Sequence, residues 1–327
     1  MKAWMRILEV HLTSKLLKRK FVFGANDEVI DNNLNISITG SKYMSTLKDT
    51  CTIKIDNLTY DEIIAIIKGQ YYDVEVKCGY KDAGSRTIFK GGVLYISNSL
   101  NADKTNTAII LCGSQLVARY GQSRMNLTLN SGINMHSAIK FVLRRAGIKD
   151  AEISTQLKKR FLQDTLNVND TAGSWLNKLA QNNNSYITNS DSSTGSILSI
   201  YDANKSNRRV IKLKSDFINL SGGYPQLTEQ GLELSVMPTF SFMCGDIIQI
   251  DPSLINLPVQ NKDEIQKNYG YYLDEDGQYM IFEQRFNLQN RGSNFSITLN
   301  CKARNFISKF AGTTSTSGSV GNGGGIR

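Results

Sequence analysis

The stretch from Cys51 to Cys112 constrains the fold more than any other part of the chain. Apolar and polar residues alternate through Cys51–Asp56 and again through Asp73–Cys78, which is typical of half-buried strands. Between these strands, Thr59 and Glu62 have the spacing of a capping box and predict the start of a short helix. A helix of this length is unstable in isolation. We therefore expect it to lie against the flank of a barrel or curled sheet.

An apolar stripe on this helix predicts the side that packs against the sheet. Its members share the spacing of one helical face: Tyr60, Ile63, Ile64 and Ile67. A turn at Gly79–Gly84 follows, and then Ile88–Ile96 and Thr107–Cys112 predict two more strands. The whole stretch thus predicts a β-rich domain with one helical plug.

The length of 327 residues predicts two or three domains, each with its own core. No run approaches the ~18 apolar residues that a membrane-spanning helix needs. Arg6 and Glu9 interrupt the apolar N-terminal stretch, which therefore predicts a strand and not a signal peptide. We expect a protein that folds in a cytoplasm and does not insert stably into a membrane.

The composition divides the chain into four parts. Residues 1–120 predict a β-barrel with the short helix, and residues 121–218 a small α+β domain. Residues 219–308 predict a second β-barrel, and 309–327 form a flexible tail rich in Gly, Ser and Thr. The predicted fold class is therefore mainly β, with a helix-containing middle module between two barrels.

The middle and last parts contain the clearest local signals. One amphipathic helix is expected from Asn134 to Ala146, and a second is expected to start near Asp170 as its N-cap. In the last part, Phe295–Cys301 is a cleanly alternating strand, and Asp276-Gly277 predicts a hairpin turn. Both predicted barrels contain a strand, a loop and a second strand that ends in a cysteine. We therefore treat a relationship between the two barrels as a hypothesis.

Charge and cysteine content leave several function classes open. The net charge of +9, from 38 basic and 29 acidic residues, permits an anionic partner but does not require one. The densest basic clusters, residues 15–20 and 158–160, predict solvated loops, with a nucleic-acid patch as the alternative. The cysteines lack metal-site spacing and predict buried free thiols. They are Cys51, Cys78, Cys112, Cys244 and Cys301.

No catalytic, cofactor-binding or metal-binding residue can be assigned. The two histidines, His11 and His136, lie apart from any nucleophile motif, and a structural role is expected for both. Asp274–Gly277 begins like a calcium loop, but the later ligands of that pattern are missing. We therefore expect a protein that is not an enzyme and needs no cofactor, although a pair of carboxylates could still meet in space.

Several short motifs occur in order along the chain: Ile55–Leu58, Val74–Tyr80, Ile88–Gly91, Ser137–Ile139, Ser174–Leu176 and Ser221–Asp251. Together they resemble phage tail baseplate hub proteins of T-even and Mu-like phages. The resemblance covers roughly residues 1–308 and implies two barrels with the tail-tube fold. The chain shows no segment like the spike domains fused to hubs in type VI secretion, so a spike is expected to be a separate chain.

The resemblance implies a homotrimer in the virion, assembled in the bacterial cytoplasm. Three chains with two tube-like barrels each would join a sixfold tail tube to a threefold central spike. The implied partners are the tube protein, the spike and other baseplate proteins, with DNA passing only in transit through an axial channel. We expect the positive charge to lie mainly outside that channel.

Two alternatives remain open from the sequence. The first is a tail-associated cell-wall hydrolase with an unseen carboxylate pair. The second is a basic β-barrel that binds nucleic acid, for which aromatic residues interleaved with the basic clusters would be expected. The tail, 309–327, is either plain disorder or a tether that orders on a neighbouring protein.

Overall fold

The computed structural model describes residues 6–14, 18–24, 34–44, 49–68, 72–100, 105–114, 123–147, 151–153, 155–182, 185–192, 195–202, 209–215, 218, 223–228, 231–256 and 277–303. The first segment forms β1 (Arg6–Ser14), β2 (Arg19–Gly24), β3 (Ile36–Tyr43), β4 (Thr50–Asp56), α1 (Tyr60–Lys68), β5 (Tyr72–Tyr80), β6 (Gly84–Leu100) and β7 (Asn106–Ser114). The middle segment forms β8 (Arg124–Leu129), α2 (Met135–Arg145), β9 (Ala151–Ile153), the 3-10 helix η3 (Thr155–Lys159), β10 (Leu166–Thr171), α3 (Ala172–Asn182), β11 (Ser185–Ser192) and β12 (Gly195–Asp202). The last segment forms β13 (Val210–Lys212), β14 (Gln226–Thr228), β15 (Gly231–Val236), β16 (Ile247–Gln249), η6 (Pro252–Leu254), β17 (Gln278–Gln289) and β18 (Phe295–Ala303).

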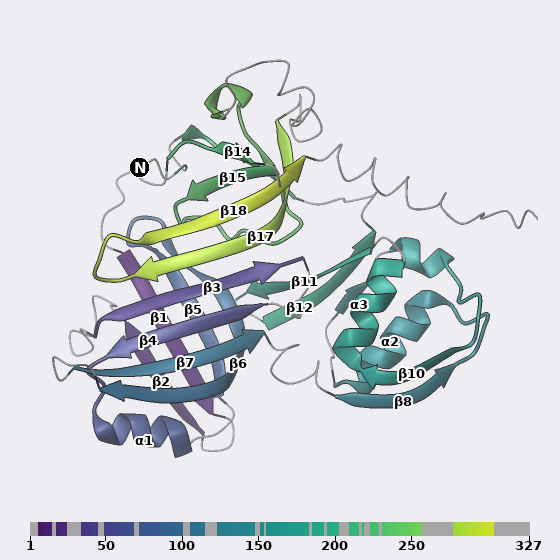
Figure 1. Ribbon diagram of the computed structural model, residues 1–327, viewed down its shortest axis with the longest axis horizontal. Coiled ribbons are helices and arrows are strands. Elements are labelled where there is room, and N and C mark those ends of the chain that lie inside the picture. The colour runs from purple at the N-terminus through teal and green to yellow at the C-terminus, as the bar shows by residue number, and fades with distance from the viewer. Residues whose placement is uncertain are drawn as a thin grey trace, which may run out of the picture.

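The central feature of the fold is a sheet of 13 described strands that combines the two ends of the chain. Its main order is β14-β15-β18-β17-β3-β4-β7-β6-β5-β1-β2, with β16 on β17 and β13 on β16. The two ends meet where β3 pairs antiparallel with β17, so that Thr39 lies opposite Asn287. In Figure 1, β15, β18, β17, β3, β4 and β7 form the front layer, with β1 and β5 behind them.

A hydrophobic core fills the inside of this curled sheet. Apolar residues alternate with polar ones along the strands, as Ile36 and Ile38 do on β3 and Ile297 and Leu299 on β18. Buried residues from both ends of the chain belong to the same cluster. The two ends are therefore packed together as well as hydrogen-bonded.

The middle segment packs around a separate core. In it, α2 and α3 bury Ile139, Val142 and Leu176 together with Ile200 of β12. The β8–β10 pair and the β11-β12-β9 sheet complete this module. Figure 1 shows the module beside the large sheet, which it contacts through β11 and β6.

The capping box predicted for the first helix is confirmed. The backbone N–H of Thr59 donates to Glu62 Oε2 over 2.9 Å, and the Glu62 N–H donates back to Thr59 Oγ1. The predicted apolar stripe is partly wrong, because the helix buries Ile63 and Ile66 and exposes Tyr60 and Ile67. A helix of nine residues needs only two buried side chains, three positions apart, to contact the sheet.

The second predicted helix start is displaced by one residue. The helix expected from Asn134 is confirmed as α2, and Asn134 caps it. Thr171 and not Asp170 caps α3, because Thr171 Oγ1 accepts from the Ser174 N–H. Asp170 instead accepts from Ser174 Oγ and from Lys178 Nζ. The hydrogen bonds from Lys178, Ser174 and the Thr171 backbone lower the pKa of Asp170 to about 2.

The predicted fold class is confirmed, since the protein is mainly β with curled sheets and a helix-containing middle module. The division at 120, 218 and 308 stays a prediction; the structure adds that the first and third parts share one sheet. Arg19 and Lys20, expected in a loop, belong to β2 because they pair with β1. The hairpin turn at Asp276, the calcium-like Asp274–Asp276 and the tail lie outside the described residues.

Candidate functional site

The outward side of β15, β18, β17, β3 and β4 forms one surface, which we call the polar face. Directly opposite residues of neighbouring strands point to the same side of a sheet. The middle of this surface is a row of uncharged side chains, which we call the polar row. It consists of Ser296, Asn287, Thr39 and Thr52.

The polar row continues into two apolar residues on β7 and β6. Thr52 lies opposite Leu111, and Leu111 lies opposite Tyr95. Leu111 is 37% exposed and Tyr95 is 62% exposed. We call this pair the apolar end of the row. The two residues form a small apolar pair across neighbouring strands that is exposed to water.

The charges of the polar face lie on either side of the polar row. On one side, Arg285 pairs with Glu283; on the other, Lys54 is exposed and Asp56 accepts a hydrogen bond from Thr107 Oγ1. Within the described residues, no charged side chain occupies a position of the row itself. Its hydroxyl and amide groups can hydrogen-bond water without carrying net charge.

The opposite side of the barrel differs in character. On the outside of β1, β5 and β6, His11 lies opposite Glu75, which lies opposite Lys90. His11 Nε2 is 2.9 Å from Glu9 Oε2, and Lys90 Nζ is 3.7 Å from Glu75 Oε1. On this surface, titratable side chains lie in contact with one another, as His11 does with Glu9 and Lys90 with Glu75.

A buried carboxylate lies at the upper edge of the polar face. Glu283 is only 3% exposed and accepts from Arg285 Nε over 2.7 Å and from Asn300 Nδ2 over 2.7 Å. A β-bulge between Ile281 and Glu283 places the carboxylate on this side of β17. Burial opposes the ionisation of Glu283, but hydrogen bonds from Arg285, Asn300 and Tyr43 outweigh it and lower the pKa.

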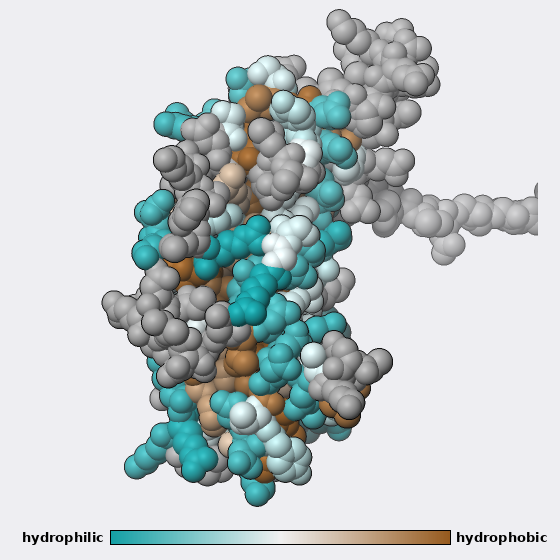
Figure 2. Space-filling model, turned by 90° about the vertical axis from the view of Figure 1, so that its left-hand side faces the viewer, coloured by the Kyte–Doolittle hydropathy of each residue, from teal (hydrophilic) through white to brown (hydrophobic). Residues whose placement is uncertain are grey.

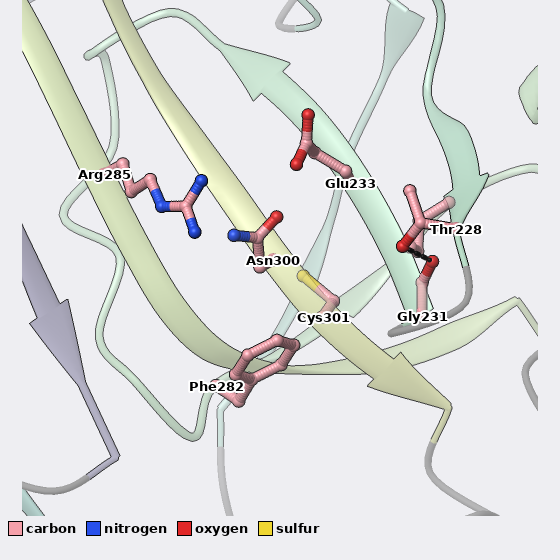
Figure 3. A pocket seen from close by; sticks show the side chains of 8 residues that line it. Thr228, Gly231, Glu233, Phe282, Arg285, Asn300 and Cys301 are labelled. Atoms are coloured by element: carbon pink, nitrogen blue, oxygen red, sulfur yellow. Dashed lines mark hydrogen bonds between the residues drawn. The ribbon is translucent and has the colours of Figure 1, made fainter.

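A cavity of about 450 Å³ opens beside this carboxylate. Figure 3 shows Arg285, Glu233, Asn300 and Phe282 around it, on β17, β18 and β15. The Thr228 hydroxyl donates to the Gly231 carbonyl over 2.9 Å and closes one side. The Arg285 guanidinium is bound to Glu283, and Glu233 also lines the cavity, so the cavity presents mixed charge.

The histidines lie apart from one another and from this cavity. His11 is paired with Glu9 on β1, and His136 lies in the first turn of α2, where burial and Lys158 lower its pKa. Among the described residues there is no group of three or more His, Cys, Asp or Glu that could hold a metal ion. None of the helices in that part of the chain could cross a membrane.

The thiols are placed as the sequence predicts. Each one is buried and free of disulfides: Cys51, Cys78, Cys112, Cys244 and Cys301. Cys51 and Cys112 lie directly opposite each other on β4 and β7. Burial raises the pKa of Cys112 to about 12, so this thiol is chemically quiet at neutral pH.

Sequence reasoning missed the polar face and the Glu283 cluster. The alternation of Ser37, Thr39 and Ser41 was visible, but a strand pattern does not say which strand lies beside it. The bulge at Phe282 reverses the alternation along β17 and hides the outward position of Glu283. Knowledge of the β3–β17 pair would have revealed both features.

Figure 2 shows a different side of the molecule, the left-hand side of Figure 1. Hydrophobic side chains appear there at several separate places between hydrophilic ones. Separate apolar areas of this kind are ordinary on protein surfaces.

The fold is that of phage tail proteins. The 43 kDa tail protein of prophage MuSo2 from Shewanella oneidensis matches with a TM-score of 0.59 and 10% identity, over 92% of this chain and 99% of that one. A tail protein from Neisseria meningitidis MC58 matches with a TM-score of 0.54 and 9% identity, over 93% and 99%. The Escherichia coli c3393 protein, a type VI secretion component, matches with a TM-score of 0.54 and 9% identity, over 84% and 75%.

The family model of baseplate hub gp41 matches residues 16–301. The chain therefore belongs to this baseplate hub family, as its motifs predict. It has a structural role in the phage baseplate and is a component of the virion. A search of curated protein sequences gave no match.

Proposed function

We propose that the chain forms a homotrimeric ring at the tip of the phage tail. The ring joins the sixfold tail tube to a threefold central spike and leaves an axial channel for DNA. Its partners are the tube protein, the spike and other baseplate proteins, and it assembles in the cytoplasm of the bacterial host.

The observation that carries this proposal is the sheet shared by the two ends of the chain. Each end contributes an antiparallel pair of long strands, β6–β7 and β17–β18. The pair β3–β17 holds the two ends in a fixed arrangement. Three such chains would present six similar strand pairs around one axis, which suits contact with a sixfold tube above and a threefold spike below.

The apolar end of the polar row supports self-association. Tyr95 and Leu111 are exposed on neighbouring strands. In the proposed ring, this pair meets the next copy. Closed rings require each copy to use two different surfaces. In this arrangement the apolar end of one copy packs against the last segment of the next.

We also propose that the chain has no catalytic activity. The buried carboxylate beside the cavity, Glu283, is tied into a structural pair with Arg285. A zymogram on bacterial cell walls tests this, and clear lysis by the purified chain would contradict it.

Native mass spectrometry of the purified chain, alone and with the tube and spike proteins, tests the proposed assembly. The proposal predicts a trimer that binds both partners. A stable monomer that ignores both would overturn it.

A further inference from the structure

Exposed cations and aromatic rings gather on one side of the middle module. Phe141 lies on the outward face of α2 and is 44% exposed, and Phe161 lies on the segment after η3 and is 60% exposed. Five exposed cations accompany them on these two segments. We call the group the basic patch, and its members are Lys140, Phe141, Arg144, Arg145, Lys158, Lys159 and Phe161.

The two segments of the patch lie side by side. The Met135 N–H donates to the Arg160 carbonyl over 2.9 Å, so the segment after η3 runs beside the first turn of α2. Burial, Lys158 and Lys140 lower the pKa of His136 in that turn, so one cation from each segment acts on the same ring. The patch is therefore continuous across both segments.

Within the described part of the chain, no carboxylate pairs with the cations of the patch. The ion pairs found there involve none of the five. Arg144 and Arg145 suit the C-terminal end of α2, where the helix dipole favours positive charge. That explanation does not apply to Lys140, in the middle of the helix, or to Lys158, beside its start. The patch thus concentrates more positive charge than the fold needs.

The patch lies away from the large sheet. The middle module contacts that sheet through β11 and β6, and in Figure 1 β11 and β12 lie between the sheet and the two helices. The opposite face of α2 packs into the core of the module through residues such as Ile139 and Val142. The exposed face of α2 is therefore open to a partner on the far side of the module.

We propose that the basic patch binds reversibly to the surface of a membrane that contains anionic phospholipids. Clusters of about four to eight Lys and Arg on an amphipathic helix attract anionic headgroups, and each cation near the surface strengthens binding by about fivefold. Exposed Phe side chains enter the boundary between headgroups and acyl chains. The patch offers both kinds of contact, and the binding is peripheral. It does not depend on the proposed ring.

Other partners fit the patch less well. Protein interfaces are depleted in Lys, whereas Lys140, Lys158 and Lys159 make up most of the cations here. A DNA duplex would bind the cations through its phosphates but leave both Phe rings in water. A single strand stacks its bases on open ring faces, and the Arg145 guanidinium already lies over Phe141, 5.8 Å from the ring centre.

Co-sedimentation with vesicles tests the proposed binding. The purified chain should bind vesicles of phosphatidylglycerol and phosphatidylcholine, bind pure phosphatidylcholine at least tenfold more weakly, and dissociate as salt is added. Binding should weaken at least tenfold in the patch triple variant, Lys140→Gln with Arg144→Gln and Lys158→Gln. It should change less than twofold in a matched control that removes three exposed cations elsewhere, Lys54→Gln with Lys68→Gln and Arg86→Gln.

Tryptophan fluorescence tests the contact of the aromatic rings with lipid. Phe161→Trp adds a fluorophore to the patch, and Tyr60→Trp, at a position on α1 that is 72% exposed, is the control. Anionic vesicles with brominated acyl chains should quench the fluorescence that Phe161→Trp adds to that of the two native tryptophans. They should leave the fluorescence added by Tyr60→Trp unchanged. Circular dichroism verifies that each variant is folded.

Three results would overturn the inference. They are failure of the chain to bind anionic vesicles, equal weakening by the patch triple variant and its control, and absence of quenching in Phe161→Trp. Patch-dependent binding of single-stranded DNA, with vesicle binding unaffected by the patch variants, would assign the surface to nucleic acid instead. A trimeric ring that ignores vesicles contradicts this inference alone, and a monomer that binds vesicles contradicts only the proposed function.

Discussion

Gly40 of β3 lies directly opposite Phe286 of β17, and the Phe286 ring fills the space into which a side chain at position 40 would project. These residues are far apart in the sequence but meet at the pair of strands that unites the two ends of the chain. A Cβ atom at position 40 would lie 2.3 Å from Phe286 Cζ and 2.5 Å from the Thr50 carbonyl oxygen. Glycine is therefore required here for close packing.

Gly40→Ala should lower the free energy of unfolding by about 1–3 kcal/mol, because overpacking forces the neighbouring strands apart. Ser41→Ala, whose side chain points to the other side of β3, is the control and should change little. Urea denaturation measures both. In a Phe286→Leu background, Gly40→Ala should destabilise the fold by less than it does in the wild type. Some destabilisation should remain, because the Thr50 carbonyl cannot move aside. Equal stability of Gly40→Ala and Ser41→Ala would contradict this packing.

Glu283 should make stability depend on pH in the acid range. Because its pKa is lower in the folded state than the ordinary value of 4.5, its ionised form favours folding. This contribution is complete above pH 4.5 and is lost as pH falls through the lower folded-state pKa. Glu283→Gln should therefore lower the free energy of unfolding by about 1–2 kcal/mol near neutral pH. The effect is smaller than for a fully buried ion pair, because Arg285 is partly exposed.

The difference between wild type and Glu283→Gln should shrink below pH 4.5, and denaturation curves at a series of pH values measure it. Glu233→Gln, on the same surface but exposed, serves as the control. A difference that stays constant across this range would show that the Glu283 charge does not stabilise the fold.

The buried thiols should be unreactive in the native protein. Burial raises the pKa of Cys112 to about 12 and raises those of Cys51, Cys78, Cys244 and Cys301, so little thiolate exists at neutral pH. A thiol reagent should react slowly with the folded chain and rapidly with all five cysteines in denaturant. Rapid reaction of a native cysteine would mean that its strand opens to solvent.

The apolar end of the polar row should control assembly of the trimer. Tyr95→Ser with Leu111→Ser removes the exposed apolar pair and should weaken association by about 1–3 kcal/mol per contact, the value of burying one such side chain. Val22→Ser, an exposed apolar position on β2, is the control. Sedimentation at several concentrations measures the trimer fraction, and an unchanged fraction in the double variant would place the contact elsewhere.

Local structure could be predicted well from this sequence, and the strand arrangement could not. The capping box of Thr59 and Glu62, the Asn134 cap and the buried faces of most strands follow from short-range patterns. The β3–β17 pair depends on residues about 250 positions apart, for which periodicity carries no information. The strands β8 and β10 were not predicted at all. Arg124–Leu129 is short, although its apolar and polar residues alternate, and Leu166–Thr171 is short and largely polar.

The polar face illustrates the same limit. Its residues look like ordinary exposed strand positions when each strand is read alone. Only the register that brings Ser296, Asn287, Thr39 and Thr52 into line shows that the absence of charge is continuous. The family could nevertheless be predicted, because the order of its short motifs survives along the chain.

A cryo-electron microscopy reconstruction of the purified tail tip tests the central claim most directly. The account predicts three copies of this chain in a ring between tube and spike. A reconstruction in which the chain is present in another copy number, or lies at the outer rim of the baseplate, would contradict it.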